Sequence, residues 1–406
     1  MSRRAAFIVV ALIALASGLF FAIAPGEIEK RTNMVDGKPL LEVSDEARTL
    51  HATLRIVDLH SDTLLWKRSM LDLANRGHVD LPRLQQGYVA LQIFSSVTKS
   101  PEDQNYDSNP SNTDELTALV VSQLQSVRTW GSLLERTLFH AEKMDRAVAG
   151  SDGELVAVAN AGDLEALLAA RAGPSDGPTG SLFSAEGLHS LEGEIANLDK
   201  VYDAGMRMAG LTHFFDNRLA GSMHGEEKGG LTDFGREVVR AMEDKGMVVD
   251  IAHCSHQCVA EVLEMARRPV VSSHGGVQAT CDVNRNLSDD EVRGVAANGG
   301  IIGVGYWPGA VCDTSPASVA AAMTHIRDLV GIEHVALGSD YDGATTVRFD
   351  TSGLVQVTQA LLNAGFSEDE IRAVMGENAI RLLSRGLVPL AELPPEEERA
   401  EVEDTA

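Results

Sequence analysis

Aromatic residues make up only 5% of this 406-residue chain, and three of them are tryptophans. Grooves that bind carbohydrates or bases rely on stacked aromatic side chains, so such a groove is not expected here. Positive charge is also scarce, because 34 lysines and arginines face 59 aspartates and glutamates, for a formal net charge of −25. This balance argues against nucleic acid or an anionic membrane surface as a partner. No internal repeat or glycine-rich nucleotide-binding loop stands out in the sequence.

Cysteine is rare as well, and all four residues fall in one later stretch: Cys254, Cys258, Cys281 and Cys312. The spacing of Cys254 and Cys258 beside His253 could suggest a zinc knuckle, but no second Cys/His pair at a suitable distance completes one. Export would permit disulfides, although their pairing cannot be read from the sequence. We therefore interpret the cysteines as structural.

A long hydrophobic run, residues 5–24, contains no charged residue and follows Arg3 and Arg4. Its length suits a membrane-spanning helix or a long signal peptide. A cut at its end would put Pro25 directly after the cleaved bond and hinder cleavage, so we favour an uncleaved anchor over residues 1–30. The two arginines place the N-terminus in the cytoplasm and the remainder on the periplasmic or extracellular side. Cleavage would instead give a secreted protein.

Eight short apolar runs of β type recur along the chain, separated mostly by helical patterns. The runs are continuous rather than alternating, which is typical of parallel strands covered on both faces. They lie at residues 54–59, 89–94, 181–184, 208–212, 247–252, 269–273, 300–306 and 335–339. Their alternation with helices predicts an α/β fold, a TIM-type (β/α)8 barrel, over residues 46–388. We expect a polar tether over residues 31–45 and an acidic, disordered tail over residues 389–406.

One connection is oversized. Residues 95–180 contain a pattern for a long amphipathic helix at 114–149 and another helix at 161–171, and we interpret them as an extended crossover with an insertion. Near the C-terminus, Ser367 and Glu370 have the spacing of a capping box that begins a helix.

Polar side chains follow the ends of most of these apolar runs. The first run is followed by His60 and Asp62, the third by Glu186, the fourth by His213, the fifth by His253, the sixth by His274 and the eighth by Asp340. Any one of them is more simply a hydrogen-bonded structural residue. However, the active site of such a barrel forms at the C-terminal ends of its strands, so a set in phase with the strands predicts one shared site.

The residue types at these positions predict a site for two divalent metals. Residues two apart on a strand point to the same side, so His60 and Asp62 can hold one metal. His253 and His274 would hold the other, and Glu186 is the available carboxylate to bridge the two, since no lysine lies at a strand end to be carbamylated. Imidazoles mixed with carboxylates favour zinc, so we expect two Zn²⁺ per chain.

Such a centre would turn a bridging water into a hydroxide nucleophile at neutral pH. Asp340 would accept the proton of that water and pass it to the leaving group. His213 would stabilise the oxyanion, unless it is a buried core histidine. Arg285 could clamp a substrate carboxylate or be a surface arginine. Tyr306 could line the pocket or pack as a core aromatic residue.

These residues lie in motifs that together resemble the membrane (renal-type) dipeptidases, peptidase family M19. The motifs occupy residues 57–62, 77–84, 185–187, 211–213, 250–253, 273–274, 285–286 and 338–343. They follow the family order across about residues 45 to 388. The sequence departs from the family pattern in two places, at Leu188 and at the pair 275–276 (Gly-Gly), but neither departure removes a ligand.

The resemblance implies a distorted barrel with a binuclear zinc site bridged by Glu186, usually in a homodimer. It also implies hydrolysis of dipeptides, including those with a D-residue at the C-terminal position. His213 would contact the scissile region, Arg285 would hold the C-terminal carboxylate and Asp340 would manage protons. The alternatives are a metallohydrolase of another amide or ester, such as a lactam, lactone or N-acyl amino acid, and a non-catalytic, membrane-tethered binding protein.

Overall fold

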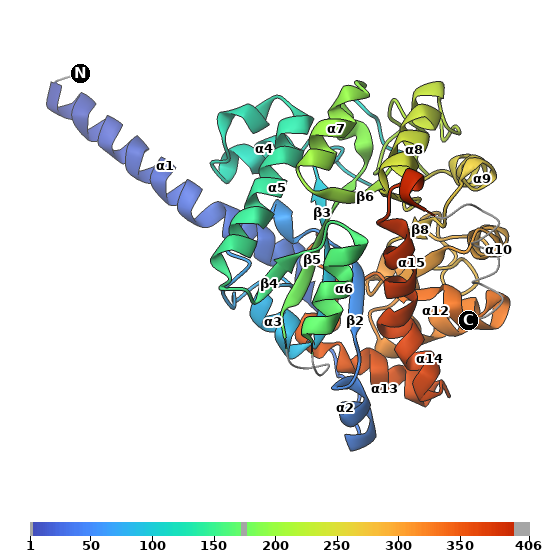
Figure 1. Cartoon of the computed structure of the whole chain (residues 1–406). Coiled ribbons are helices and arrows are strands. Elements are labelled where there is room, and N and C mark those ends of the chain that lie inside the picture. Colours follow the sequence, from blue (N-terminus) through green and yellow to red (C-terminus); the bar gives the residue numbers. More distant parts are fainter. Residues whose placement is uncertain (1–2, 172–176, 394–406) are drawn as a thin grey trace.

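The computed structural model describes residues 3–171 and 177–393, and its centre is a closed barrel of parallel strands (Figure 1). The barrel strands are β2 (Ile56–Ser61), β3 (Val89–Val97), β5 (Thr179–Glu186), β6 (Met206–Gly210), β7 (Val248–Asp250), β8 (Val271–Ser272), β9 (Ile301–Val304) and β10 (Val335–Leu337). Each pairs with the next, and the β10–β2 pairing closes the ring. A ninth strand, β4 (Leu155–Ala157), pairs with the beginning of β5. The predicted TIM-type barrel is confirmed.

The strands divide their side chains between the barrel interior and the layer of helices outside. On β2, Val57 and Leu59 pack outward in one apolar cluster with Leu383 of the C-terminal helix. Asp58 and His60 alternate with them and contact polar groups of neighbouring strands instead. Because the side-chain period of a strand is two, one short segment supplies both an apolar outer face and a polar inner face.

Helices cover the outside of the barrel. They are α3 (Leu81–Gln86), α6 (Ala161–Ala170), α7 (Ala196–Asp203), α8 (Asp233–Lys245), α9 (His256–Met265), α10 (Asp289–Ala297), α12 (Pro316–Val330), α13 (Val355–Asn363), α14 (Glu368–Arg372) and α15 (Asn378–Gly386). The predicted capping box is confirmed, because the side chains of Ser367 and Glu370 each accept a hydrogen bond from the backbone N–H of the other residue. These caps satisfy N–H groups that a helix leaves unpaired at its start.

The prediction of one long helix at 114–149 is wrong, because the helix is interrupted in the middle of this segment. The chain forms α4 (Leu116–Ser122), a short 3-10 turn (Val127–Trp130) and α5 (Leu133–Gly150) instead. The break follows from Leu124, whose φ of +56° cannot continue a right-handed helix, and from Ser132, whose side chain caps α5 at the N–H of Glu135. Apolar residues keep their helical spacing across this break, so the sequence pattern does not reveal the break.

The N-terminal helix α1 (Arg3–Thr32) projects away from the barrel in Figure 1. By length and composition it could cross a membrane, and its most apolar window is not buried against the rest of the chain. Its last turns differ, since Pro25 and Glu29 are buried. Directly after it, β1 (Met34–Val35) pairs in parallel with β11 (Thr346–Val347), so the chain reaches the barrel mouth before residue 36.

Candidate metal centre and active site

The barrel brings the predicted metal ligands together at the C-terminal ends of its strands. His60 lies in the last part of β2 and Asp62 directly follows it, Glu186 ends β5, and His253 and His274 follow β7 and β8. All five are almost completely buried, at 1–5% exposure. His253 has a φ of +64°, a conformation that non-glycine residues rarely adopt and that tends to gather at functional sites.

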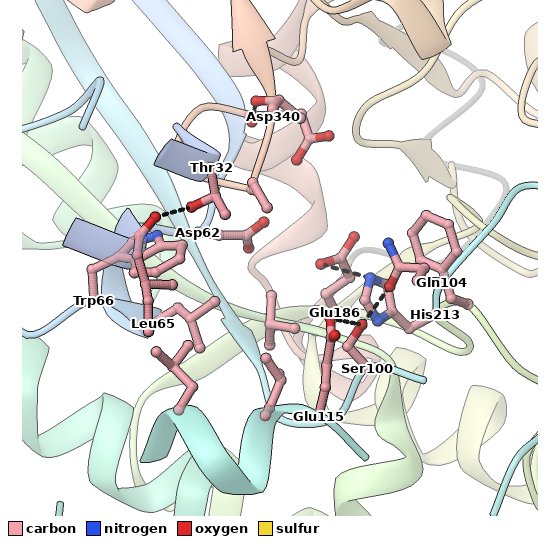
Figure 2. A pocket seen from close by; sticks show the side chains of 18 of the residues that line it. Thr32, Asp62, Leu65, Trp66, Ser100, Gln104, Glu115, Glu186, His213 and Asp340 are labelled. Carbon is pink, nitrogen blue, oxygen red and sulfur yellow. Dashed lines mark hydrogen bonds and ion pairs between the residues drawn. The ribbon is translucent and has the colours of Figure 1, made fainter. Parts of the chain in front are cut away.

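Glu186 is at the centre of the group. Its Oε1 lies 2.8 Å from Nε2 of His253, 3.1 Å from Nε2 of His274 and 3.8 Å from Nε2 of His60. Its other oxygen, Oε2, lies 3.4 Å from Nε2 of His213 (Figure 2). One carboxylate therefore faces four imidazoles from four different strand ends, which is the position that a bridging ligand requires.

The cluster has the properties of a cation site. Burial raises the pKa of Asp340 well above its usual value, and the nearby Asp62 adds to this. Burial and the charge of Glu186 raise the pKa of Asp62 to about 7. Burial would raise the pKa of Glu186 too, but His213 and His60 hold it well below its usual value. Three carboxylates in so small a volume repel one another, and a divalent cation between them removes that repulsion.

Unpaired polar atoms point to the same conclusion. Nε2 of His60 and Oδ1 of Asp62 are buried without a hydrogen-bond partner, although the two atoms lie 3.3 Å apart. A buried polar atom without a partner is costly, and a metal ion coordinated by both would remove the cost. Imidazole nitrogen with carboxylate oxygen is a donor set that suits zinc and related ions. The residues present therefore fit a divalent metal site.

Two buried aspartates form hydrogen bonds next to the clustered site residues. They are not among the site residues predicted from the sequence. Asp250 accepts hydrogen bonds from the backbone N–H and the hydroxyl of Ser273, and that hydroxyl lies 2.9 Å from Nδ1 of His274. Asp58 accepts the same pair of bonds from Ser339. The hydroxyl of Ser273 can thus orient the imidazole of His274, whereas that of Ser339 donates to the backbone carbonyl of His60. The available signal was an acidic residue inside an otherwise apolar strand, a place where an unpaired charge is rarely found.

The residues expected to contact substrate lie beside the cluster. Arg285 is 2% exposed, and its Nη2 donates a hydrogen bond to the carbonyl of His274 at 2.8 Å. Gly275 makes room for it, because a Cβ there would lie 3.1 Å from Nη1 of Arg285. Asp340 lines the same pocket and has a φ of +57°. Tyr306 is fully buried against Tyr341 and Phe349, and its neighbour Trp307 lines the pocket.

A cavity of about 640 Å³ opens above these groups. Asp62, Glu186, His213, His253, Arg285 and Asp340 are among the residues that line it. The volume is of the size that holds a small ligand. Cys281 and Cys312 form a disulfide that ties the loop carrying Arg285 to the end of α11 (Pro308–Val311), whereas Cys254 and Cys258 are buried free thiols.

A closed parallel barrel that gathers imidazoles and carboxylates at its strand ends defines a metal-dependent hydrolase. The family model described as membrane dipeptidase (peptidase family M19) matches residues 44–387. The dipeptidase aclJ of Aspergillus oryzae is 30% identical over 349 residues, which cover 81% of this chain and 77% of that protein. This chain therefore belongs to the membrane dipeptidase family, peptidase family M19, and is a metallo-dipeptidase.

Two solved structures share the fold. The probable dipeptidase PvdM from Pseudomonas aeruginosa superposes with a TM-score of 0.69 at 19% identity, over 84% of this chain and 98% of that one. A metallo peptidase from Rhodobacter sphaeroides, solved with a phosphinate mimic of the dipeptide L-Ala-D-Ala, superposes with a TM-score of 0.65 at 22% identity, over 82% and 99%. Both likenesses concern the barrel as a whole.

Proposed function

We propose that this chain is a zinc-dependent dipeptidase with two Zn²⁺ bridged by Glu186. His60 and Asp62 would hold one ion, and His253 and His274 the other. The observation that carries the proposal is the position of Glu186, whose Oε1 lies within 3.8 Å of Nε2 of His60, His253 and His274. When bound, the ions would supply the Lewis acidity that polarises a peptide carbonyl and activates water.

The remaining site residues divide the work on the substrate. Arg285 would bind the C-terminal carboxylate, because its guanidinium is a two-pronged donor that matches a carboxylate. His213 faces the same cavity and would stabilise the oxyanion that forms at the scissile carbonyl. Asp340 would move a proton from the attacking water to the leaving amine. The mimic of L-Ala-D-Ala bound by the Rhodobacter relative supports dipeptides with a C-terminal D-residue as substrates of this chain.

Two features, α1 and the disulfide, support a proposal for the position of the enzyme in the cell. We propose that α1 is an uncleaved anchor with the barrel on the periplasmic or extracellular side of the membrane. The bond between Cys281 and Cys312 supports that side, because disulfides persist in oxidising compartments. By family resemblance the working form would be a homodimer.

Removal of metal is the direct test. Dialysis against a chelator is expected to reduce hydrolysis of L-Ala-L-Ala by at least about 100-fold, because the nucleophile and the carbonyl both depend on the ions. Addition of Zn²⁺ should restore the rate, and elemental analysis should then give two zinc atoms per chain. Chelator already saturated with zinc is the control for chelator effects other than metal removal. A metal-free protein that keeps its full rate would contradict the proposal.

Replacement of Arg285 separates a dipeptidase from a hydrolase of other amides or esters. Arg285→Met is expected to raise KM for a free dipeptide about 10- to 100-fold, since a charged hydrogen bond contributes about 1.5–3 kcal/mol. KM for the methyl ester of the same dipeptide should change little. Arg293→Met, on the outer helix α10, is the matched control, because that side chain is 53% exposed. Wild-type enzyme that hydrolyses the free and esterified dipeptides equally well would favour the alternative hydrolase.

A further inference from the structure

The last turns of α1 are fastened to the barrel by a buried carboxylate. Glu29 is 1% exposed, and its Oε1 and Oε2 accept hydrogen bonds from Nε of Arg68 at 2.5 Å and Nε of Arg76 at 2.7 Å. Arg68 also donates to Asp342, two residues beyond the site residue Asp340. A buried acid held by two guanidiniums is a fixed attachment point, because a buried carboxylate needs such partners.

Backbone pairing continues the attachment beyond the helix. Asn33 accepts a hydrogen bond at its side-chain oxygen from the N–H of Ala344, and the N–H of Met34 donates to the carbonyl of Thr345. The hydroxyl of Thr345 in turn donates to the carbonyl of Asp340. The end of α1 is therefore held directly against the loop that carries Asp340.

This attachment places one face of α1 over the cavity above the metal centre. Phe20, Ile28 and Thr32 line that cavity, and their spacing of eight and four residues puts them on the same side of a helix. Leu65 and Trp66, which follow β2, also line the cavity, and Figure 2 shows them on the same side as Thr32, across from Glu186 and His213.

The wall formed by α1 is apolar and partly uncovered. Phe20 and Ile28 are 53% and 40% exposed, and Leu116 and Leu119 of α4 line the same cavity. The charged part of the lining comes from Asp62, Glu186, Arg285 and Asp340. A dipeptide held there by its carbonyl and carboxylate has only its side chains left to meet the apolar wall, and burial of an apolar side chain against such a wall is favourable.

We propose that α1 is part of the substrate pocket and that Phe20 and Ile28 select dipeptides with a large apolar side chain. The inference rests on the proposed dipeptidase activity and adds the class of substrate. It gives the membrane-proximal helix a role in specificity beside that of an anchor. Phe20 lies near the end of the uncharged run at residues 5–24, so the wall includes the last part of that run.

The test uses the full-length protein in detergent micelles and compares L-Ala-L-Ala with L-Leu-L-Ala and L-Ala-L-Leu. The double variant Phe20→Ala/Ile28→Ala is expected to lower kcat/KM about tenfold or more for at least one leucine dipeptide, the range seen for apolar pocket contacts. The deciding quantity is the ratio of kcat/KM for the leucine dipeptide to kcat/KM for L-Ala-L-Ala on the same preparation, which should fall relative to the wild type. Ile28→Trp, which narrows the cavity beside α1, should lower the same ratio.

Phe7→Ala is the matched control, because Phe7 lies on the same helix with its side chain 75% exposed. It should leave all three rates unchanged. If the wild-type enzyme cleaves the dipeptides and every variant has the wild-type ratio of kcat/KM for leucine dipeptides to kcat/KM for L-Ala-L-Ala, the role of α1 in specificity is overturned. The proposed function would then still stand. Wild-type enzyme with bound metal and no dipeptide turnover would overturn the proposed function and this inference together.

Discussion

Glu186→Gln is expected to empty the metal site and reduce kcat for a dipeptide by about 1000-fold or more. The amide carries no charge, and it would turn N–H groups toward imidazole nitrogens that now face a carboxylate oxygen within 3.1 Å, those of His253 and His274. If Glu186 bridges two ions, as proposed, both lose the same anionic ligand. Metal content by elemental analysis and kcat on the same preparation measure both effects.

Glu115→Gln is the matched control for this variant. Glu115 lines the same cavity, but its carboxylate lies 3.3 Å from the hydroxyl of Ser100 and is not among the imidazoles. We expect this variant to keep the metal content of the wild type and to stay within a few-fold of its rate. A Glu186→Gln enzyme with full metal content and full rate would show that Glu186 is not a metal ligand.

Asp340→Asn is expected to lower kcat about 100- to 10,000-fold, the usual contribution of a positioned acid–base group, while both metal ions stay bound. Asparagine keeps the size of the side chain but cannot take a proton from the attacking water. Because the binding groups remain, KM should change little, so the loss falls on kcat. Steady-state kinetics with elemental analysis test this, and again Glu115→Gln shows how much any loss of a pocket carboxylate matters.

An Asp340→Asn enzyme that loses its zinc would change the interpretation of this residue. Asp340 would then be a metal ligand or a support for one, and the proton transfer would need another group. Retained zinc with retained kcat would exclude both roles.

The barrel was readable from the sequence because its strands are buried on both faces. Runs such as 89–94 and 335–339 are continuous and apolar, and the polar residues that follow runs of this kind mark the end where the site forms. His60 and Glu186 lie far apart in sequence, yet each ends a strand, so their meeting follows from the fold.

The features that could not be predicted depend on single backbone angles or on distant partners. The break between α4 and α5 depends on the positive φ of Leu124. The periodicity of apolar residues carries no information about a single backbone angle. Which of two adjacent aromatic residues, Tyr306 or Trp307, lines the pocket depends on where β9 ends, and strand ends are uncertain by more than one residue. Glu29 gave no signal either, because its partners Arg68 and Arg76 are some forty residues away.

The hydrogen bonds of Arg68 and Arg76 to Glu29 have a practical consequence when the protein is shortened to make it soluble. Starting the chain after residue 31 would delete the acid that two arginines share and would strip Ile28 from the cavity. Rate constants from such a fragment would describe a protein that lacks α1 residues lining the cavity, Phe20 and Ile28. The detergent-extracted whole polypeptide is the form in which its preferences should be measured.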